Sequence, residues 1–145
     1  MDHVIAVSAC LLGYNCKYNG GNNLNPKLMK LLQGKKIIPI CPEQLGGLST
    51  PRIPSEIMSD GETVYDQAGH DTTLFFERGK QATYMILEQH KCHQVILKDG
   101  SPSCGYKTIY DGSFTGRKIP GEGITCKYLR EKGIEILEVT EEGEL

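Results

Sequence analysis

Short apolar runs alternate with segments of helical character along this chain of 145 residues, and this alternation limits its possible folds. Four runs rich in β-branched residues predict strands at residues 4–8, 36–40, 94–98 and 134–139. Strands that alternate with helices form a parallel sheet joined by right-handed crossovers and covered on both faces. Because 145 residues can bury one core but hardly two, we predict a single α/β domain over residues 1–145, with a parallel sheet flanked by helices.

Three segments between these strands predict helices. The first begins after Asn25, a good N-cap followed by proline, and ends near residue 32. The second begins at Asp71 or Thr72 and ends near residue 90, and the third covers about 122–132. One apolar face of the second helix is expected to contain four residues with helical spacing: Phe75, Gly79, Ala82 and Ile86.

The remaining segments predict loops. Residues 41–61 are rich in proline and glycine, so we expect a loop with little regular structure there, and a loop of this length often has a function. Asp111 and Gly112 predict a hairpin or tight turn in the turn-rich segment 106–123. The acidic residues 141–145 are expected to fray.

The charge balance and the hydropathy pattern restrict the classes of partner. The chain has 16 basic and 18 acidic residues, so it lacks the strongly basic character that attracts nucleic acids or anionic membranes. No apolar run approaches the roughly 20 residues that span a bilayer, and the first residues lack the basic stretch of a signal peptide. We therefore expect a cytoplasmic protein that binds a small molecule, and neither nucleic acid nor membrane.

The six cysteines require an explanation, because disulfides are rare in the cytoplasm. None of them forms the C-x-x-C pair of common zinc and redox motifs, so a metal site would have to combine distant segments. Cys10, Cys41 and Cys104 each follow a different predicted strand. Since α/β sheets bind ligands beyond the carboxyl ends of their strands, these three thiols are expected to converge.

Three convergent thiolates suit a soft metal. A four-iron cluster held by only three cysteines would keep one iron open to substrate, and an open iron is a Lewis acid. Two other classes of function stay open. The chain could be a thiol redox or sulfur-carrier protein that uses Cys10 and Cys16, or a non-catalytic module stabilised by zinc.

The other candidate residues have structural interpretations beside functional ones. Cys92 and Cys126 are predicted to be structural, whereas Cys16 could be a fourth ligand, a redox partner or a packing residue. Glu43 and Ser101 lie close in sequence to two of the convergent cysteines and are acid–base candidates, although a loop glutamate and a turn serine often have no such role.

One arginine, one lysine and the four histidines also have structural interpretations. Arg52 and Lys98 could neutralise an anionic cluster or substrate, or could simply face water. The four histidines show no spacing typical of metal ligands and are predicted to be structural: His3, His70, His90 and His93.

Five motifs spread over nearly the whole chain resemble, in the same order, those of one family. They are VSACLLGYNCKYNGG at 7–21, CPEQLGGLSTPRIPSE at 41–56, GHDTTLFFERG at 69–79, LKDGSPSCG at 97–105 and IYDGSFTG at 109–116. By these motifs the chain resembles the DUF523 family, whose characterised members are thiouracil desulfidases. It departs from the family at Lys17, where arginine is frequent, and at Asn19, where aspartate is frequent.

The resemblance implies a Rossmann-like α/β domain that carries a [4Fe-4S] cluster on Cys10, Cys41 and Cys104. It also implies non-redox removal of sulfur from a thiolated pyrimidine or nucleoside, in which thiouracil yields uracil and hydrogen sulfide. Glu43 and Ser101 match the family's catalytic glutamate and serine, and Cys16 has no assigned ligand role. Such a cluster can be lost in a preparation exposed to air.

Overall fold

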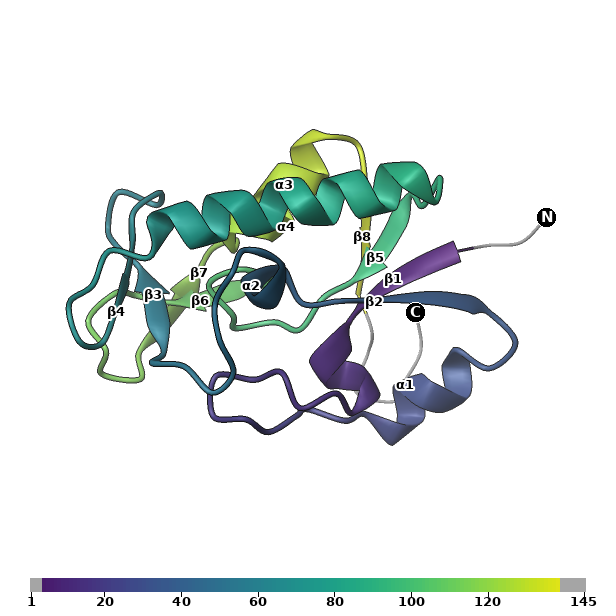
Figure 1. Ribbon diagram of the computed structural model, residues 1–145, viewed down its shortest axis with the longest axis horizontal. Helices are drawn as coiled ribbons and strands as arrows, with labels where there is room; N and C mark the ends of the chain where they lie inside the picture. Colours follow the sequence, from purple (N-terminus) through teal and green to yellow (C-terminus); the bar gives the residue numbers. More distant parts are fainter. Residues whose placement is uncertain (1–3, 139–145) are drawn as a thin grey trace.

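A four-stranded parallel sheet lies at the centre of the computed structural model, which describes residues 4–138 (Figure 1). Each neighbouring pair of strands is parallel, in the order β2-β1-β5-β8. The strands are β1 (Val4–Ser8), β2 (Lys36–Ile40), β5 (Gln94–Ile96) and β8 (Glu135–Leu137). The predicted α/β fold is therefore confirmed. β5 ends two residues earlier than predicted, and the backbone N–H of Lys98 instead donates to Ser8 Oγ at 2.9 Å.

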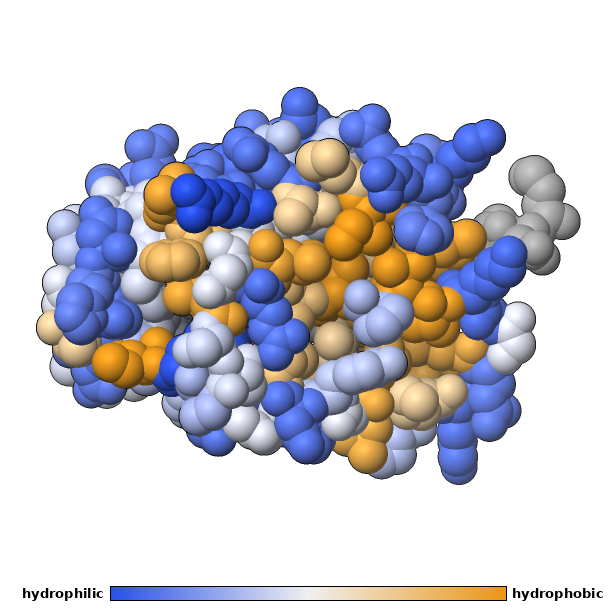
Figure 2. All heavy atoms as spheres, in the orientation of Figure 1, coloured by the Kyte–Doolittle hydropathy of each residue, from blue (hydrophilic) through white to orange (hydrophobic). Residues whose placement is uncertain are grey.

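Helices cover both faces of this sheet (Figure 1). The three longer helices are α1 (Pro26–Leu31), α3 (Thr73–Gln89) and α4 (Ile124–Glu131). Because successive side chains of a strand point to opposite faces, Ile5 and Val7 pack in the cluster that includes α1, whereas Ala6 packs in the cluster that includes α3 and α4. The outward surface of α3 is mostly polar, and apolar side chains gather around the edge strand β2 (Figure 2).

The starts of α1 and α3 agree with the capping residues predicted for them. The side chain of Asn25 accepts a hydrogen bond from Leu28 N at 3.1 Å, which satisfies an amide in the first turn of α1. At the start of α3, Asp71 Oδ1 accepts from Thr73 N at 2.9 Å. Local sequence signals therefore explain where both helices begin.

The buried face of α3 differs from the predicted face. Its buried residues are Phe76, Gly79, Thr83 and Leu87, so the inclusion of Phe75, Ala82 and Ile86 was wrong. The physical reason is direct backbone contact with α2 (Pro42–Leu45), since a Cβ atom at Gly79 would lie 2.2 Å from Pro42 O. This contact fixes the rotation of α3 about its axis, and it also fixes the segment that follows β2.

The segment 41–61 is mostly loop, as predicted, but it contains two short regular elements. α2 is a single turn that begins with proline, and β3 (Ser55–Ile57) pairs antiparallel with β4 (Val64–Asp66). Both elements are stabilised by partners outside the segment: α2 packs on α3, and β3 pairs with β4. Local composition could not reveal either partner.

A second hairpin lies beside β3. It consists of β6 (Thr108–Tyr110) and β7 (Lys118–Pro120), which are antiparallel. The predicted turn at Asp111 and Gly112 begins the loop of this hairpin, where Asp111 Oδ1 accepts from Ser113 N at 2.9 Å. The fraying predicted for residues 141–145 concerns a segment outside the described residues. None of the helices within residues 4–138 has the length and apolar composition needed to cross a membrane.

Candidate active site

The carboxyl ends of three neighbouring strands border one cavity of about 380 Å³. Ser8 ends β1 and Ile40 ends β2, while Lys98 follows β5, and all three residues line the cavity. β1 lies between β2 and β5, so the next strand in the chain is placed on one side of β1 and the later strands on the other side. Such a switch point is where open α/β sheets bind their ligands.

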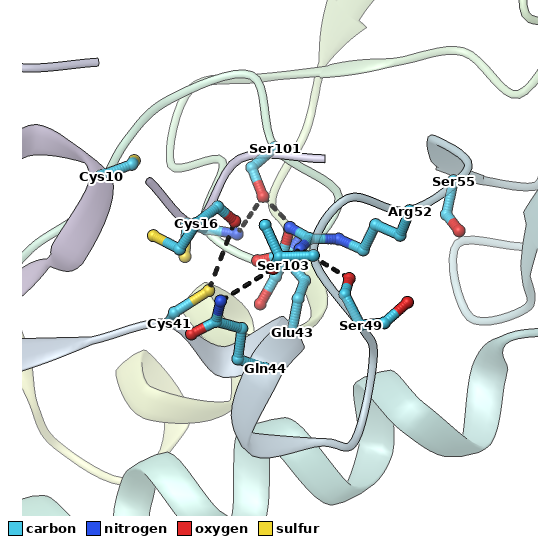
Figure 3. Close-up of polar contacts among 12 residues, drawn as sticks. Cys10, Cys16, Cys41, Glu43, Gln44, Ser49, Arg52, Ser55, Ser101 and Ser103 are labelled. Atoms are coloured by element: carbon cyan, nitrogen blue, oxygen red, sulfur yellow. Dashed lines mark hydrogen bonds and ion pairs between the residues drawn. The ribbon is translucent and has the colours of Figure 1, made fainter. Parts of the chain in front are cut away.

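The three cysteines predicted to converge all line this cavity. Cys10 lies in the 3-10 helix η1 (Ala9–Leu12), immediately after β1. Cys41 lies between β2 and α2, and Cys104 lies in the loop that follows β5. The structure therefore brings the three thiols together from segments up to 94 residues apart, and Figure 3 shows the region around Cys10 and Cys41.

Burial raises the pKa of all three thiols above the usual value of 9.0, and the nearby Glu43 carboxylate adds to the rise. At Cys10, a hydrogen bond from Asn23 Nδ2 to Sγ at 3.4 Å and the positive charge of Lys98 partly offset this rise. Metal ligation requires thiolates, and a metal cation supplies the positive charge that stabilises them. The donor set therefore fits a soft metal centre.

The three thiols share one cavity but do not form a site for a single ion. Among residues 4–138, no group of three or more His, Cys, Asp and Glu side chains is arranged to hold a single metal ion. A zinc ion binds its thiolates at about 2.3 Å and so brings their sulfurs within about 4 Å of one another. In an iron–sulfur cluster each cysteine binds its own iron, so its ligands need not meet at one ion.

Cys16 is a fourth thiol on the same cavity. It is buried, and Cys41 Sγ donates to its carbonyl oxygen at 3.9 Å. Burial, together with the neighbouring Cys41 and Cys10, raises the pKa of Cys16 to about 12. All six cysteines of the chain lie within the described residues and are free thiols, so Cys16 forms no disulfide with Cys10.

Glu43 lies in the first turn of α2 and lines the cavity. Its Oε2 accepts a hydrogen bond from Arg52 Nη2 at 2.9 Å, and both side chains are largely buried (Figure 3). Arg52 also donates from Nη1 to Thr50 Oγ1 at 3.1 Å. Arg52 therefore orients the Glu43 carboxylate, a contact that sequence reasoning did not predict.

Ser101 lies in the loop after β5 and lines the cavity. Its Oγ accepts hydrogen bonds from the backbone amides of Ser103 at 3.0 Å and Cys104 at 3.1 Å (Figure 3). These bonds shape the turn that carries Cys104. Because both amides are donors to Oγ, the hydroxyl hydrogen of Ser101 is free to donate to another group.

Two further residues organise the site and were missing from the predicted set. Asp99 Oδ1 accepts from the amides of residues 106, 107 and 108 at 3.0 to 3.1 Å, and despite the opposing effect of burial these bonds lower its pKa. Aspartate often accepts hydrogen bonds from backbone amides in turns, so the turn-rich sequence around Asp99 could have indicated this role. No sequence pattern indicated that Asn23 would donate to Cys10. Lys98 Nζ donates to Asp99 O at 2.7 Å.

The cysteines predicted to be structural lie in the hydrophobic core. Cys92 Sγ donates to the carbonyl oxygens of Val4 and Gln94, at 3.4 and 3.2 Å. Cys126 lies inside α4, and its Sγ contacts Glu122 Oε2 at 3.7 Å. Neither lines the cavity.

The described histidines also lie apart from the cavity. His70 Nδ1 is 3.1 Å from Asp66 Oδ2, and His90 Nδ1 is 2.9 Å from the carbonyl oxygen of Ile86. His93 is exposed at the entry to β5, and His3 lies outside the described residues. These placements agree with a structural role.

Comparison with known proteins extends over nearly the whole chain. The 2-thiouracil desulfurase family matches residues 5–141. The uncharacterized protein YbbK of Bacillus subtilis (strain 168) is 40% identical over 146 residues, which cover 95% of this chain and 97% of YbbK. A solved structure described as the [4Fe-4S]-dependent thiouracil desulfidase TudS (DUF523Vcz) is 38% identical, covers 94% of this chain and 89% of its own, and superposes with a TM-score of 0.85. The motifs that resemble DUF523 are thereby confirmed as a family relationship, and the chain belongs to the 2-thiouracil desulfurase family.

Proposed function

We propose that this protein removes sulfur from a thiolated pyrimidine, so that thiouracil and water yield uracil and hydrogen sulfide. The observation that carries the proposal is the meeting of three thiols, a carboxylate and a hydroxyl on one cavity: Cys10, Cys41, Cys104, Glu43 and Ser101. Family membership and the likeness to a [4Fe-4S]-dependent thiouracil desulfidase support the same reaction. A cavity of about 380 Å³ suits a small ligand, and the balanced charge of the chain favours a free pyrimidine or nucleoside over nucleic acid.

Cys10, Cys41 and Cys104 would hold a [4Fe-4S] cluster. Four cysteines complete the ligation of such a cluster, so three leave one iron without a protein thiol. When bound, the cluster supplies a Lewis-acidic iron that draws electron density from the thiocarbonyl sulfur and makes the adjoining carbon susceptible to water. The chain's own residues must then manage the protons.

Glu43 is the acid–base group in this proposal. The Arg52 guanidinium binds Oε2 and holds the carboxylate on the cavity wall, where Glu43 can activate water or protonate a ring nitrogen as the carbon–sulfur bond breaks. Water supplies the oxygen of uracil, and its two protons leave with the sulfur as hydrogen sulfide. No electron is gained or lost overall, so the reaction needs no external donor.

Ser101 can bind the substrate while it also stabilises the loop that carries Cys104. Its oxygen accepts the amides of Ser103 and Cys104, which holds Cys104 in place, and its hydroxyl hydrogen can donate to the substrate or relay a proton. We expect Ser101 mainly to orient the substrate, and therefore to contribute less to the rate than Glu43 does.

The proposal is tested with protein reconstituted anaerobically and assayed for iron and sulfide. We expect a brown protein that converts 2-thiouracil, 4-thiouracil or 4-thiouridine to uracil or uridine, with sulfide release and without an electron donor. A full cluster with no product from any of the three compounds would overturn the proposal. A colourless protein with a reversible Cys10–Cys16 disulfide would indicate the redox alternative, and one equivalent of zinc would indicate the zinc module.

The raised pKa of Cys16, about 12, weighs against the redox alternative. Reactive cysteines that exchange disulfides have a lowered pKa, because the thiolate is the nucleophile. Cys16 is also buried, which limits its access to a partner thiol.

A further inference from the structure

The loop that joins β6 and β7 brings an aromatic side chain to the cavity. Phe114 lies in this loop and lines the cavity that contains the thiols. Its backbone φ is +56°, in the left-handed region that bulky residues rarely adopt. Such conformations persist where surrounding contacts impose them, and they cluster at ligand sites. A left-handed phenylalanine on a cavity wall is therefore a candidate for contact with the ligand.

The carboxylate of Glu56 holds the backbone of this loop next to β3. Glu56 lies on β3 and is 9% exposed, and its Oε1 accepts hydrogen bonds from Gly112 N at 2.9 Å and Phe114 N at 3.1 Å. Gly112 also lies directly against β3, because a Cβ atom at that position would come within 2.7 Å of Ile57 O. One buried oxygen therefore fixes two amides of the loop, including that of Phe114 itself.

Three other aromatic side chains line the cavity, and each has contacts that engage it elsewhere. Phe76 is 2% exposed and packs in the core beside β3 and β4. A lysine ammonium lies over each tyrosine ring, 6.0 Å from the centroid of Tyr18 and 5.5 Å from that of Tyr110. Phe114 is half-buried, so its ring is the one best placed to receive a flat ligand.

We propose that Phe114 contacts the substrate by stacking on its pyrimidine ring, and that Glu56 is a positioning residue that holds Phe114 for this contact. The inference rests on the proposed function for the identity of the ligand. Aromatic faces stack on bases with little regard to their substituents. Phe114 would therefore bind thiouracil and uracil alike and contribute to binding more than to sulfur removal.

Binding of uracil, the unreactive product, to the reconstituted protein provides the test, measured by anaerobic calorimetry. Phe114→Ala is expected to weaken the Kd for uracil by about 5- to 150-fold, the range typical of base–aromatic stacking. The KM for thiouracil should rise with it while kcat changes little, since binding is lost equally in ground and transition states. Met85→Ala, on the exposed surface of α3 and away from the cavity, is the control and should change neither value.

The role of Glu56 is tested by comparing two substitutions. Glu56→Ala removes the acceptor of both amides and should weaken uracil binding in the same range as Phe114→Ala, whereas Glu56→Gln keeps an acceptor oxygen and should remain close to the wild type. If Glu56 acts through Phe114, Glu56→Ala adds little in the Phe114→Ala background. Should Phe114→Ala lower the cluster content, Phe114→Leu, which keeps an apolar side chain without an aromatic face, gives the same comparison.

Each outcome bears on a different part of the inference. An unchanged Kd in the Phe114 variant, at wild-type cluster content and melting temperature, overturns the stacking role. Additive losses in the double variant overturn the positioning role of Glu56. A wild-type protein that binds uracil, weakened by Phe114→Ala, but makes none from thiouracil overturns the proposed function and leaves the stacking role supported. A wild-type protein that binds neither compound overturns both.

Discussion

Cys104 and Cys126 are buried to similar extents, 3% and 1% exposed, and both pack in the core between the sheet and helices α3 and α4. Burial raises the pKa of both thiols. They differ in position, because Cys104 lines the cavity beyond the strand ends whereas Cys126 lies inside α4. Position at the carboxyl ends of the strands, rather than burial, therefore separates the proposed ligands from the structural thiols.

Each of these two regions also contains a glutamate–arginine pair. Glu43 and Arg52 are largely buried beside the cavity, at 2.9 Å. Glu122 and Arg130 lie beside Cys126, with hydrogen bonds of 2.7 and 2.8 Å, and are more exposed. The first pair presents a carboxylate to the cavity, and the second joins α4 to the preceding loop. The two regions thus offer matched pairs of substitutions.

The largest effect is expected from the proposed cluster ligands. Cys10→Ala, Cys41→Ala and Cys104→Ala should each abolish retention of iron and sulfide after anaerobic reconstitution, because each of the three cysteines would bind a different iron of the cluster. Cys92→Ala and Cys126→Ala should keep the wild-type iron content. Wild-type iron in any of the first three variants would remove that residue from the ligand set. Loss of iron from a folded Cys126→Ala protein would break the distinction between the two regions.

A smaller effect is expected from the two glutamates. Glu43→Gln should lower kcat by about 10²- to 10⁴-fold at unchanged iron content, the usual contribution of a general acid–base group. Glu122→Gln is the matched control from the second region and should leave kcat unchanged. Steady-state rates of uracil formation check both. Similar kcat values in the two variants would show that Glu43 is no more than an ion-pair partner of Arg52.

Ser101→Ala should lower kcat less than Glu43→Gln does. It leaves the amides of Ser103 and Cys104 without their acceptor, so the unfolding free energy should also fall, by about 1–3 kcal/mol. Ser103→Ala is the control: its buried hydroxyl bonds Thr125 Oγ1 at 2.7 Å, and its loss should cost stability without affecting kcat. Chemical denaturation and rate measurements on both variants separate the two effects. Equal kcat losses would assign Ser101 a purely structural role.

The sequence predicted the strands, the longer helices and the meeting of the three cysteines, because these depend on neighbouring residues or on the order of the strands. The cap at Asn25 binds an amide three residues away, and the thiols of Cys10 and Cys41 follow their strands by no more than two residues. Parallel strands carry such residues to one edge of the sheet whatever the intervening sequence. The convergence of the cysteines was therefore predictable, although their role as ligands stays a prediction.

Contacts between distant segments were not predictable in the same way. The rotation of α3 about its axis depends on close contact with α2 and the glycines after it, where Phe75 lies against Gly47 and Phe76 enters the core instead. Nothing in the sequence distinguishes Glu56 from an ordinary loop glutamate. In the structure, β3 places its carboxylate at the amide of Phe114, which lies 58 residues later in the chain. No periodicity or spacing encodes such a pair, so residues that organise the cavity were missed.

The smallest effect is expected from the ion pair of the second region, and it concerns stability alone. The hydrogen bond from Arg130 lowers the pKa of Glu122 from its usual value of 4.5. The folded state therefore favours the carboxylate, and this contribution is present above that usual value and fades as the pH falls through the lower folded value. Because exposed ion pairs are weak, Glu122→Gln should lower the melting temperature at neutral pH by at most about 4 °C. The difference from the wild type should narrow as the pH falls below the usual value of 4.5, and also at high salt. A difference that stays constant as the pH falls would exclude the charge of Glu122 as its cause.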